Sequence, residues 1–297
     1  MTKIAIYFLD EVEDIDVSPH EFRPIGYVRD RWELTEDYEE ADWIYFYLDY
    51  LNCNEQFTRL QGDPVWRQYR DKAILYSMHD TPSFAYLQPH GVKFLAQPMV
   101  GKEENLTNQI VSMPLQMRGY EQELIKDEAF IRELREIPKK TDFCFIGQTA
   151  YMGRAKFHPE NMRISLPEGA TYSFRGTTPI WHVKDLQGRL ELTKDFCREV
   201  AQAKFGFAPR GIGSSSFRLY QSLMSGTIPI IYGMTDFPFT EALDWSEFSV
   251  NGDKMNLKSL LDLDHEKMRK RAIEVWDEYF HMTKTDEYLF ETYLEKQ

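Results

Sequence analysis

The chain has 297 residues, which at roughly 150 residues per domain predicts about two domains. Hydrophobic residues make up 42% and charged residues 28%, as in a globular protein with a sizeable core. The net charge of −13 argues against non-specific binding to nucleic acid or anionic membranes, and no apolar run approaches the roughly 18 residues of a membrane span.

The N-terminus and the cysteines point to a reducing compartment. Residues 1–16 lack the long apolar region and the small-residue cleavage site of a signal peptide. Cys53, Cys144 and Cys197 are far apart and odd in number, so they predict neither a disulfide framework nor a Cys-x-x-Cys metal site. We therefore expect a cytosolic protein.

Short apolar runs alternate with helical stretches along the first half of the chain. Residues 119–136 have apolar positions at helical spacing among many charges, which predicts a surface helix. The runs rich in β-branched and aromatic residues predict buried strands at 3–9, 43–48, 73–78 and 92–96. Strands that alternate with helices indicate an α/β fold with a mainly parallel sheet.

The best domain boundary lies at residues 137–142, which are polar, contain a proline and follow the predicted helix. We expect an N-terminal domain over 1–137 and a C-terminal domain over 138–282. A helix at about 283–297 is expected to pack back on the first domain.

The same alternation restarts after the boundary. Strands are predicted at 143–146, 162–166, 204–208 and 228–232, and helices at 192–203, 216–225, 257–263, 266–280 and 286–296.

The segment 204–250 carries the most informative chemistry. A short strand runs into a glycine-containing turn and three serines, and a helix follows. A serine is expected to cap this helix, and its free N–H groups and dipole form an anion site. Arg210 and Arg218 flank the helix start and suit a pyrophosphate. The string is neither a Walker loop nor G-x-G-x-x-G. On these features alone, an anion site and an ordinary capped turn fit about equally well.

The whole segment resembles the signature of the exostosin family of glycosyltransferases. Residues 205–211 match F-x-x-x-P-R-G, residues 216–219 match S-[PF]-R-L, and residues 226–230 match G-x-[IV]-P-[IV]. Residues 238–250 match P-F-x-E-x-x-D-W-S-x-F-[SA]-V. These motifs cover about 45 residues in order, so the resemblance is far more specific than a short loop motif.

Weaker matches extend upstream. Residues 143–147, followed by Arg154, resemble the family's F-x-G…R. Residues 41–47, 77–80 and 111–114 resemble its A-D-x-F-[YF]-[VI]-P, S-x-H-D and D-[VI]-x-x-P segments.

The resemblance implies a GT-B fold, in which two Rossmann-like domains face each other across a cleft. The C-terminal domain would bind a nucleotide-sugar donor, usually a UDP-sugar, and the N-terminal domain a glycan acceptor. Transfer would invert the anomeric centre without a metal or other cofactor. Consistent with this, the Asp-x-Asp spacings at 14–16 and 262–264 lie outside the donor segment.

The resemblance also assigns donor-binding residues. Arg210 and Arg218, with Arg154 as a third candidate, are expected at the diphosphate. Gln221 stands where the family usually has a glutamate for the donor ribose; an exposed helix residue fits this position equally well. Asp244 and Trp245 are expected to cap a turn and to pack. The full donor-binding prediction is Gly147, Arg154, Arg210, Gly211, Ser215, Ser216, Arg218, Gln221 and Glu241.

Inverting transfer needs a base for the acceptor hydroxyl proton. His79 and Asp80 follow a predicted strand at the edge expected to face the cleft, and Asp49 follows another. Asp10 and Glu11 after the first strand are alternatives by the same logic, and a turn or cap role fits each of these residues as well. His182 is expected either to line the donor pocket or to pack.

Two other function classes remain open: a nucleotide-sugar-binding inactive relative, and a GT-B-like enzyme of another sugar-nucleotide chemistry. Animal and plant members of the family typically carry a membrane anchor before the catalytic region. Because this chain begins at the first strand, we expect a catalytic unit alone, in the cytoplasm of a bacterium or of a virus-infected cell. The partners expected are the donor and the acceptor, without nucleic acid or an integral membrane segment.

Overall fold

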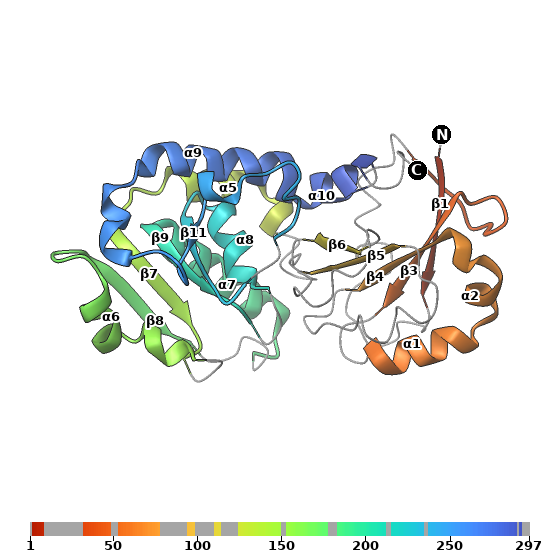
Figure 1. The fold of residues 1–297 in the computed structure, drawn as a ribbon, viewed down its shortest axis with the longest axis horizontal. Coiled ribbons are helices and arrows are strands. Elements are labelled where there is room, and N and C mark those ends of the chain that lie inside the picture. The colour runs from red at the N-terminus through yellow and green to blue at the C-terminus, as the bar shows by residue number, and fades with distance from the viewer. Residues whose placement is uncertain are drawn as a thin grey trace.

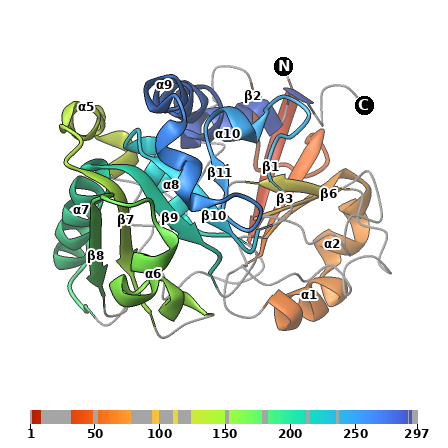
Figure 2. The ribbon, with the colours of Figure 1, turned by 60° about the vertical axis from the view of Figure 1, so that its left-hand side comes forward.

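The structure is a computed structural model. It describes residues 2–8, 32–48, 53–77, 94–98, 110–113, 124–149, 153–177, 183–211, 215–234, 237–289 and 291–292. These residues form two parallel sheets that lie side by side, the first with α1 and α2 and the second with α5 to α9 (Figures 1 and 2).

The first sheet has the strand order β2-β1-β3-β4-β5-β6, and every pairing in it is parallel. Its strands are β1 (Thr2–Phe8), β2 (Trp32–Leu34), β3 (Trp43–Leu48), β4 (Ala73–Ser77), β5 (Phe94–Pro98) and β6 (Ile110–Met113). The four strands predicted from apolar runs are confirmed to within two residues. β2 and β6 were missed, because runs of three or four residues give little periodic signal.

Two helices, α1 (Cys53–Gly62) and α2 (Pro64–Tyr69), connect β3 to β4 and were not predicted. Asp63 caps α2, since its carboxylate accepts the backbone N–H groups of Val65 and Trp66, and Pro64 occupies the first helical position. The Trp66 ring then packs against Phe46 of β3, with ring centroids 5.1 Å apart.

The second sheet has the order β11-β10-β9-β7-β8 and is also parallel throughout. Its strands are β7 (Thr141–Gly147), β8 (Tyr172–Gly176), β9 (Ala203–Pro209), β10 (Ile228–Tyr232) and β11 (Val250–Asn251). The predictions of β7, β9 and β10 are confirmed, and β8 and β11 were missed. Two parallel sheets with their helices confirm the predicted class, α/β of the GT-B type with two Rossmann-like units. The cleft between them stays a prediction.

Helices cover both faces of the second sheet. Side chains alternate along β7, so that Phe143 and Phe145 face one side and Cys144 and Ile146 the other. Figure 1 shows α6 and α9 on opposite sides of this sheet. The helices of this half are α5 (Glu128–Glu136), α6 (Pro159–Ser165), α7 (Leu186–Ala201), α8 (Phe217–Met224), α9 (His265–Val275) and α10 (Met282–Leu289).

The strand predicted at 162–166 is wrong, because these residues end helix α6 and continue one residue beyond it. His158 is extended and Pro159 occupies the first helical position, where proline is pre-organised for a helix. The buried Met162 and Leu166 stand four residues apart, as on one face of a helix.

The other helix predictions hold with changed bounds. The helix predicted at 257–263 is a 3₁₀ helix at Leu257–Asp262, and α7 begins six residues earlier than predicted. The helix predicted at 266–280 is α9 followed by a π-helical turn at Trp276–Phe280, and the last helix is α10.

The domain boundary at residue 137 stays a prediction. Helix α5, which precedes it, packs into the core of the second half through the buried Phe130, Ile131 and Leu134. The packing of the C-terminal helix on the first domain also stays a prediction. None of the helices in the described part of the chain is both long and apolar enough to span a membrane.

Candidate active site

The start of α8 lies at the carboxyl end of the second sheet, near the end of β9. The backbone N–H of Gly211 donates to the carbonyl of Ser215 at 2.7 Å, which closes the turn. Ser216 occupies the N-cap position, but its side chain makes no capping hydrogen bond, so the predicted serine cap is wrong in this detail. Instead, the hydroxyls of Ser215 and Ser216 are buried and have no hydrogen-bond partner among the described residues. Orphan hydroxyls beside a helix N-terminus leave donors ready for an anion.

Arg218 lies in the first turn of α8 and reaches back to β7. Its Nε donates to the carbonyl of Ile146 at 2.7 Å, and its guanidinium lies 5.8 Å from the ring centre of Phe145. A Cβ on Gly147 would stand 2.2 Å from Nη2 of Arg218, so only glycine leaves room for this side chain. Burial, and then the charge of Arg154, lower the pKa of Arg218 to about 9.

Arg154 stands on the 3₁₀ helix Arg154–Phe157, and its side chain is only 7% exposed. Its Nη2 donates to the carbonyl of Arg210 at 2.7 Å and to that of Pro209 at 3.3 Å, while its buried Nε has no partner in the described part of the chain. Burial lowers its pKa. Among the described residues, no carboxylate pairs with Arg154 or Arg218. Two such cations close together are costly in isolation and favour a bound anion.

Arg210 is held where β9 and β10 end. Its backbone N–H donates to the carbonyl of Tyr232 at 2.9 Å, and its side chain runs across Gly233, where a Cβ would stand 3.0 Å from Cδ. The structure therefore brings Gly147, Arg154, Arg210 and Arg218 to one edge of the sheet, together with the turn of Gly211 and its serines.

Gln221 is buried, at 6% exposure, so the alternative of an exposed helix residue is wrong. A neutral amide here avoids the desolvation cost of a buried carboxylate.

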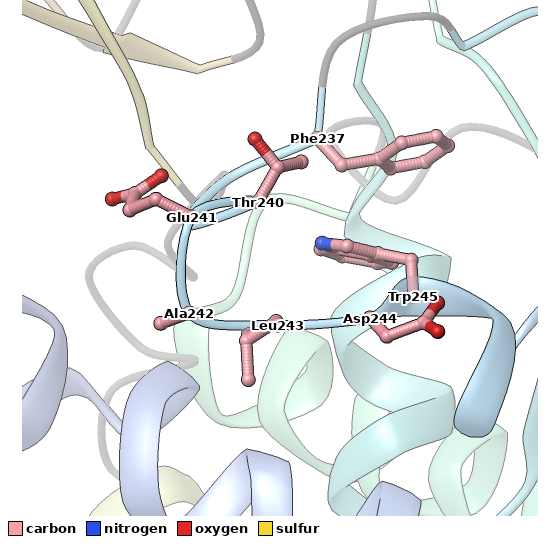
Figure 3. A pocket seen from close by; sticks show the side chains of 7 residues that line it. All are labelled: Phe237, Thr240, Glu241, Ala242, Leu243, Asp244 and Trp245. Carbon is pink, nitrogen blue, oxygen red and sulfur yellow. The ribbon is translucent and has the colours of Figure 1, made fainter.

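Glu241 belongs to a loop that follows β10 and lines a cavity of about 500 Å³ that is wide open to solvent (Figure 3). Asp244 caps a turn by accepting the N–H of Ser246 at 2.9 Å, as predicted. Trp245 packs as predicted, 4.6 Å from the ring centre of Phe237, and its Nε1 donates to the carbonyl of Pro238. The residues around the cavity are Phe237, Thr240, Glu241, Ala242, Leu243, Asp244 and Trp245.

The candidate bases lie outside the described residues: Asp49, His79 and Asp80, with the alternatives Asp10 and Glu11. His182 lies outside them as well. Within the described ranges, no group of three or more His, Cys, Asp or Glu side chains could hold a metal ion.

Sequence reasoning missed two residues at this edge. Phe145 supports the Arg218 guanidinium, and the Nζ of Lys156 lies 4.1 Å from the ring centre of Tyr232 at the end of β10. The position of Lys156, two residues after Arg154, was the only signal in the sequence that could have pointed to it.

Comparison with known proteins identifies the second half. Residues 135–265 match the family model of the Exostosin GT47 domain, which confirms the resemblance found in the sequence. This part of the chain is therefore similar to exostosin glycosyltransferase domains. No curated protein matches the chain.

Three solved structures are similar at low identity. A TarM variant of S. aureus with Fondaparinux, alpha-GlcNAc-glycerol and UDP is 9% identical over 83% of this chain and 54% of its own (TM-score 0.45). The pneumococcal O-GlcNAc transferase GtfA with UDP and GlcNAc is 10% identical over 84% and 56% (TM-score 0.39). MurG of Acinetobacter baumannii is 9% identical over 91% and 77% (TM-score 0.38). The chain thus spans little more than half the length of the first two.

Proposed function

We propose that the protein is an inverting glycosyltransferase that moves a sugar from a UDP-sugar to a hydroxyl of a glycan acceptor, without a metal ion. The observation that carries this proposal is the pair of guanidiniums of the buried Arg154 and the part-buried Arg218, which have no carboxylate partner among the described residues and lie near the start of α8. The exostosin domain of residues 135–265 supports the reaction class.

The edge of the sheet offers what a diphosphate requires. A dianion would neutralise the two arginines, and it would accept hydrogen bonds from the orphan hydroxyls of Ser215 and Ser216 and from the first N–H groups of α8. Arg210 would add a third cation from the end of β9. These groups do the work that a divalent cation does elsewhere, which is why no metal is required.

The reaction follows from this placement. The acceptor oxygen attacks the anomeric carbon from the side opposite the diphosphate, the bond to the diphosphate oxygen breaks, and the configuration inverts. The leaving diphosphate gains negative charge, which the fixed arginines stabilise. The acceptor proton passes to a carboxylate or imidazole, for which Asp80, His79 and Asp49 are the proposed candidates.

The donor, the acceptor and the compartment complete the proposal. The donor would occupy the second half, with Gln221 and Glu241 contacting its ribose and sugar, and the acceptor would lie against the first half. A cytoplasmic location fits a nucleotide-sugar donor. It also fits Cys144 and Cys197, which are buried free thiols.

Thermal unfolding with UDP, GDP and their sugar conjugates tests donor binding. UDP and one or more UDP-sugars should raise the melting temperature of the wild type, and Arg218→Ala should remove this increase. Arg163→Ala, which changes an exposed arginine of α6, is the matched control and should behave as the wild type. The proposal fails if no nucleotide stabilises the protein.

Turnover assays then separate the reaction classes. Transfer to a sugar acceptor that persists in EDTA and gives the inverted anomer by NMR is the expected result. Donor hydrolysis or phosphate release without acceptor would indicate another sugar-nucleotide chemistry, and UDP binding without turnover would indicate an inactive relative.

A further inference from the structure

Helix α10 contacts the loop that carries Glu241, although it lies far along the chain from that loop. The hydroxyl of Tyr288 donates to Oε1 of Glu241 at 3.3 Å. The Tyr288 ring also packs 4.6 Å from Phe239 and 5.3 Å from Tyr279, measured between ring centres. One side chain of α10 therefore holds the loop at two points.

The loop needs such support because its backbone is strained. Phe239 has φ of 59°, a left-handed conformation that is unfavourable for a bulky residue. Its ring is buried and also stacks on Phe280, with centroids 5.9 Å apart. Packing on Tyr288 and Phe280 stabilises this conformation, and Glu241 follows only two residues later.

The cavity beside Glu241 suits an uncharged sugar ring. Among its described lining residues there is no cation, and its polar groups are the Glu241 and Asp244 carboxylates and the Thr240 hydroxyl (Figure 3). Asp244 accepts the N–H of Ser246, and the Glu241 side chain, which accepts a hydrogen bond from Tyr288, is exposed. A carboxylate accepts hydrogen bonds from sugar hydroxyls and repels a sugar acid.

The cavity also lies next to the proposed diphosphate site along the chain. β10 ends at Tyr232, whose carbonyl accepts the N–H of Arg210, and the loop begins a few residues later. Phe217, in the first turn of α8, packs on the same apolar cluster as Phe237 and Phe239. Because β9 and β10 are neighbouring parallel strands, the segments that follow them leave the sheet at the same edge, so the cavity and the proposed diphosphate site share that edge.

We propose that Tyr288 is a positioning residue that fixes the Glu241 carboxylate to accept hydroxyls of an uncharged donor sugar. This inference rests on the proposed function. The hydrogen bond to an ionised carboxylate restricts the rotation of Glu241, so that the carboxylate is already oriented when the sugar arrives. Helix α10 then sets the affinity for the sugar part of the donor and leaves the affinity for the nucleotide unchanged.

Calorimetric titration of UDP and of UDP-glucose, UDP-galactose and UDP-N-acetylglucosamine tests this inference. The quantity of interest is the ratio of the Kd of the best UDP-sugar to the Kd of UDP. Tyr288→Phe keeps the ring on Phe239 and removes only the hydroxyl, and it should raise the ratio about 3- to 10-fold. Glu241→Gln should raise it by at least as much, and the double variant should add little more.

Tyr279→Phe is the matched control, because it removes another tyrosine hydroxyl from the same cluster and should leave the ratio unchanged. A ratio that is the same in the wild type, Tyr288→Phe and Glu241→Gln would overturn the inference while UDP still binds. If the effects of Tyr288→Phe and Glu241→Gln on the ratio added up in the double variant, Tyr288 would not act through Glu241. Absence of UDP binding in the wild type would instead refute the proposed function.

Discussion

Cations lie at both ends of the second sheet and are largely shielded from solvent. The two ends differ in how far the fold satisfies the hydrogen bonds of these cations and their neighbours. Before the amino end of β7, the Nζ of Lys139 donates to the carbonyl of Ala201 at 2.8 Å and to the hydroxyl of Thr227 at 3.2 Å. At the carboxyl end, the Nε of Arg154 and the hydroxyls of Ser215 and Ser216 are buried and find no partner within the ranges that the structure describes. A cation whose hydrogen-bond acceptors are supplied by the fold is structural, whereas a cation that lies among buried donors without acceptors is prepared for an anionic ligand.

The largest expected effect is the loss of Arg218. Arg218→Ala should reduce the turnover number by about 10²–10³, because it removes a charge that stabilises the leaving diphosphate. Steady-state kinetics at saturating donor measure the effect, and circular dichroism reports whether the fold is intact. Lys139→Met, at the opposite end of the sheet, should leave turnover unchanged. Equal losses of turnover in both variants would show that the two ends of the sheet do not differ in function.

Gly147→Ala should act on the same edge without removing any charge. The added Cβ would meet the Arg218 guanidinium, whose nearest atom stands only 2.2 Å away, so the flexible side chain must move. We expect the affinity for UDP to fall about 10-fold or more, by calorimetry, with the guanidinium displaced from the Ile146 carbonyl. Unchanged affinity would show that Arg218 does not contact the nucleotide.

Lys139→Met should flatten the pH dependence of stability. Burial, and then the charge of Arg269, lower the pKa of Lys139 from 10.5 to about 7. The unfolded chain therefore binds this proton more readily between pH 7 and 10, and stability rises with pH across that window, by at most about 1.4 kcal/mol per pH unit.

Urea unfolding of the wild type and of Lys139→Met at pH 7, 8 and 9 measures this slope. The wild type should gain stability relative to the variant as the pH rises. Parallel curves for the two proteins would show that Lys139 has an ordinary pKa in the folded state.

Ser216→Ala should give the smallest effect. It should stabilise the free protein and destabilise its complex with UDP. Removing an unpaired buried hydroxyl should stabilise the free protein by about 1 kcal/mol. The same change should weaken UDP binding a few-fold, because a donor to the phosphate is lost. Thermal unfolding with and without UDP measures both quantities. A destabilised free protein would show that the hydroxyl serves the fold.

Continuous apolar strands and the order of the donor motifs could be predicted from the sequence. β9 and β10 are almost wholly apolar, and Arg210 and Arg218 flank a glycine- and serine-rich turn, so both signals are local. α6 could not be predicted, because the apolar residues at 162, 164 and 166 also fit a strand and the cap is a histidine without a side-chain bond.

Tertiary contacts account for the rest of the site. The orphan state of Ser215 depends on the closure of the turn at Gly211, and the need for glycine at position 147 depends on a side chain 71 residues away. Tyr288 approaches Glu241 only because α10 folds back on the loop. No local pattern encodes these approaches.

The number of residues in the π-helical turn at Trp276–Phe280 affects where Tyr288 lies relative to Glu241. The turn joins α9 to α10, and each residue of a helix turns the chain by about 100°. Deleting one residue would convert the turn to an ordinary helical turn and change the direction in which the chain leaves it at the extended His281, which would displace α10 and carry Tyr288 away from Glu241. Relatives that lack one residue here would therefore have to support the donor loop by other side chains.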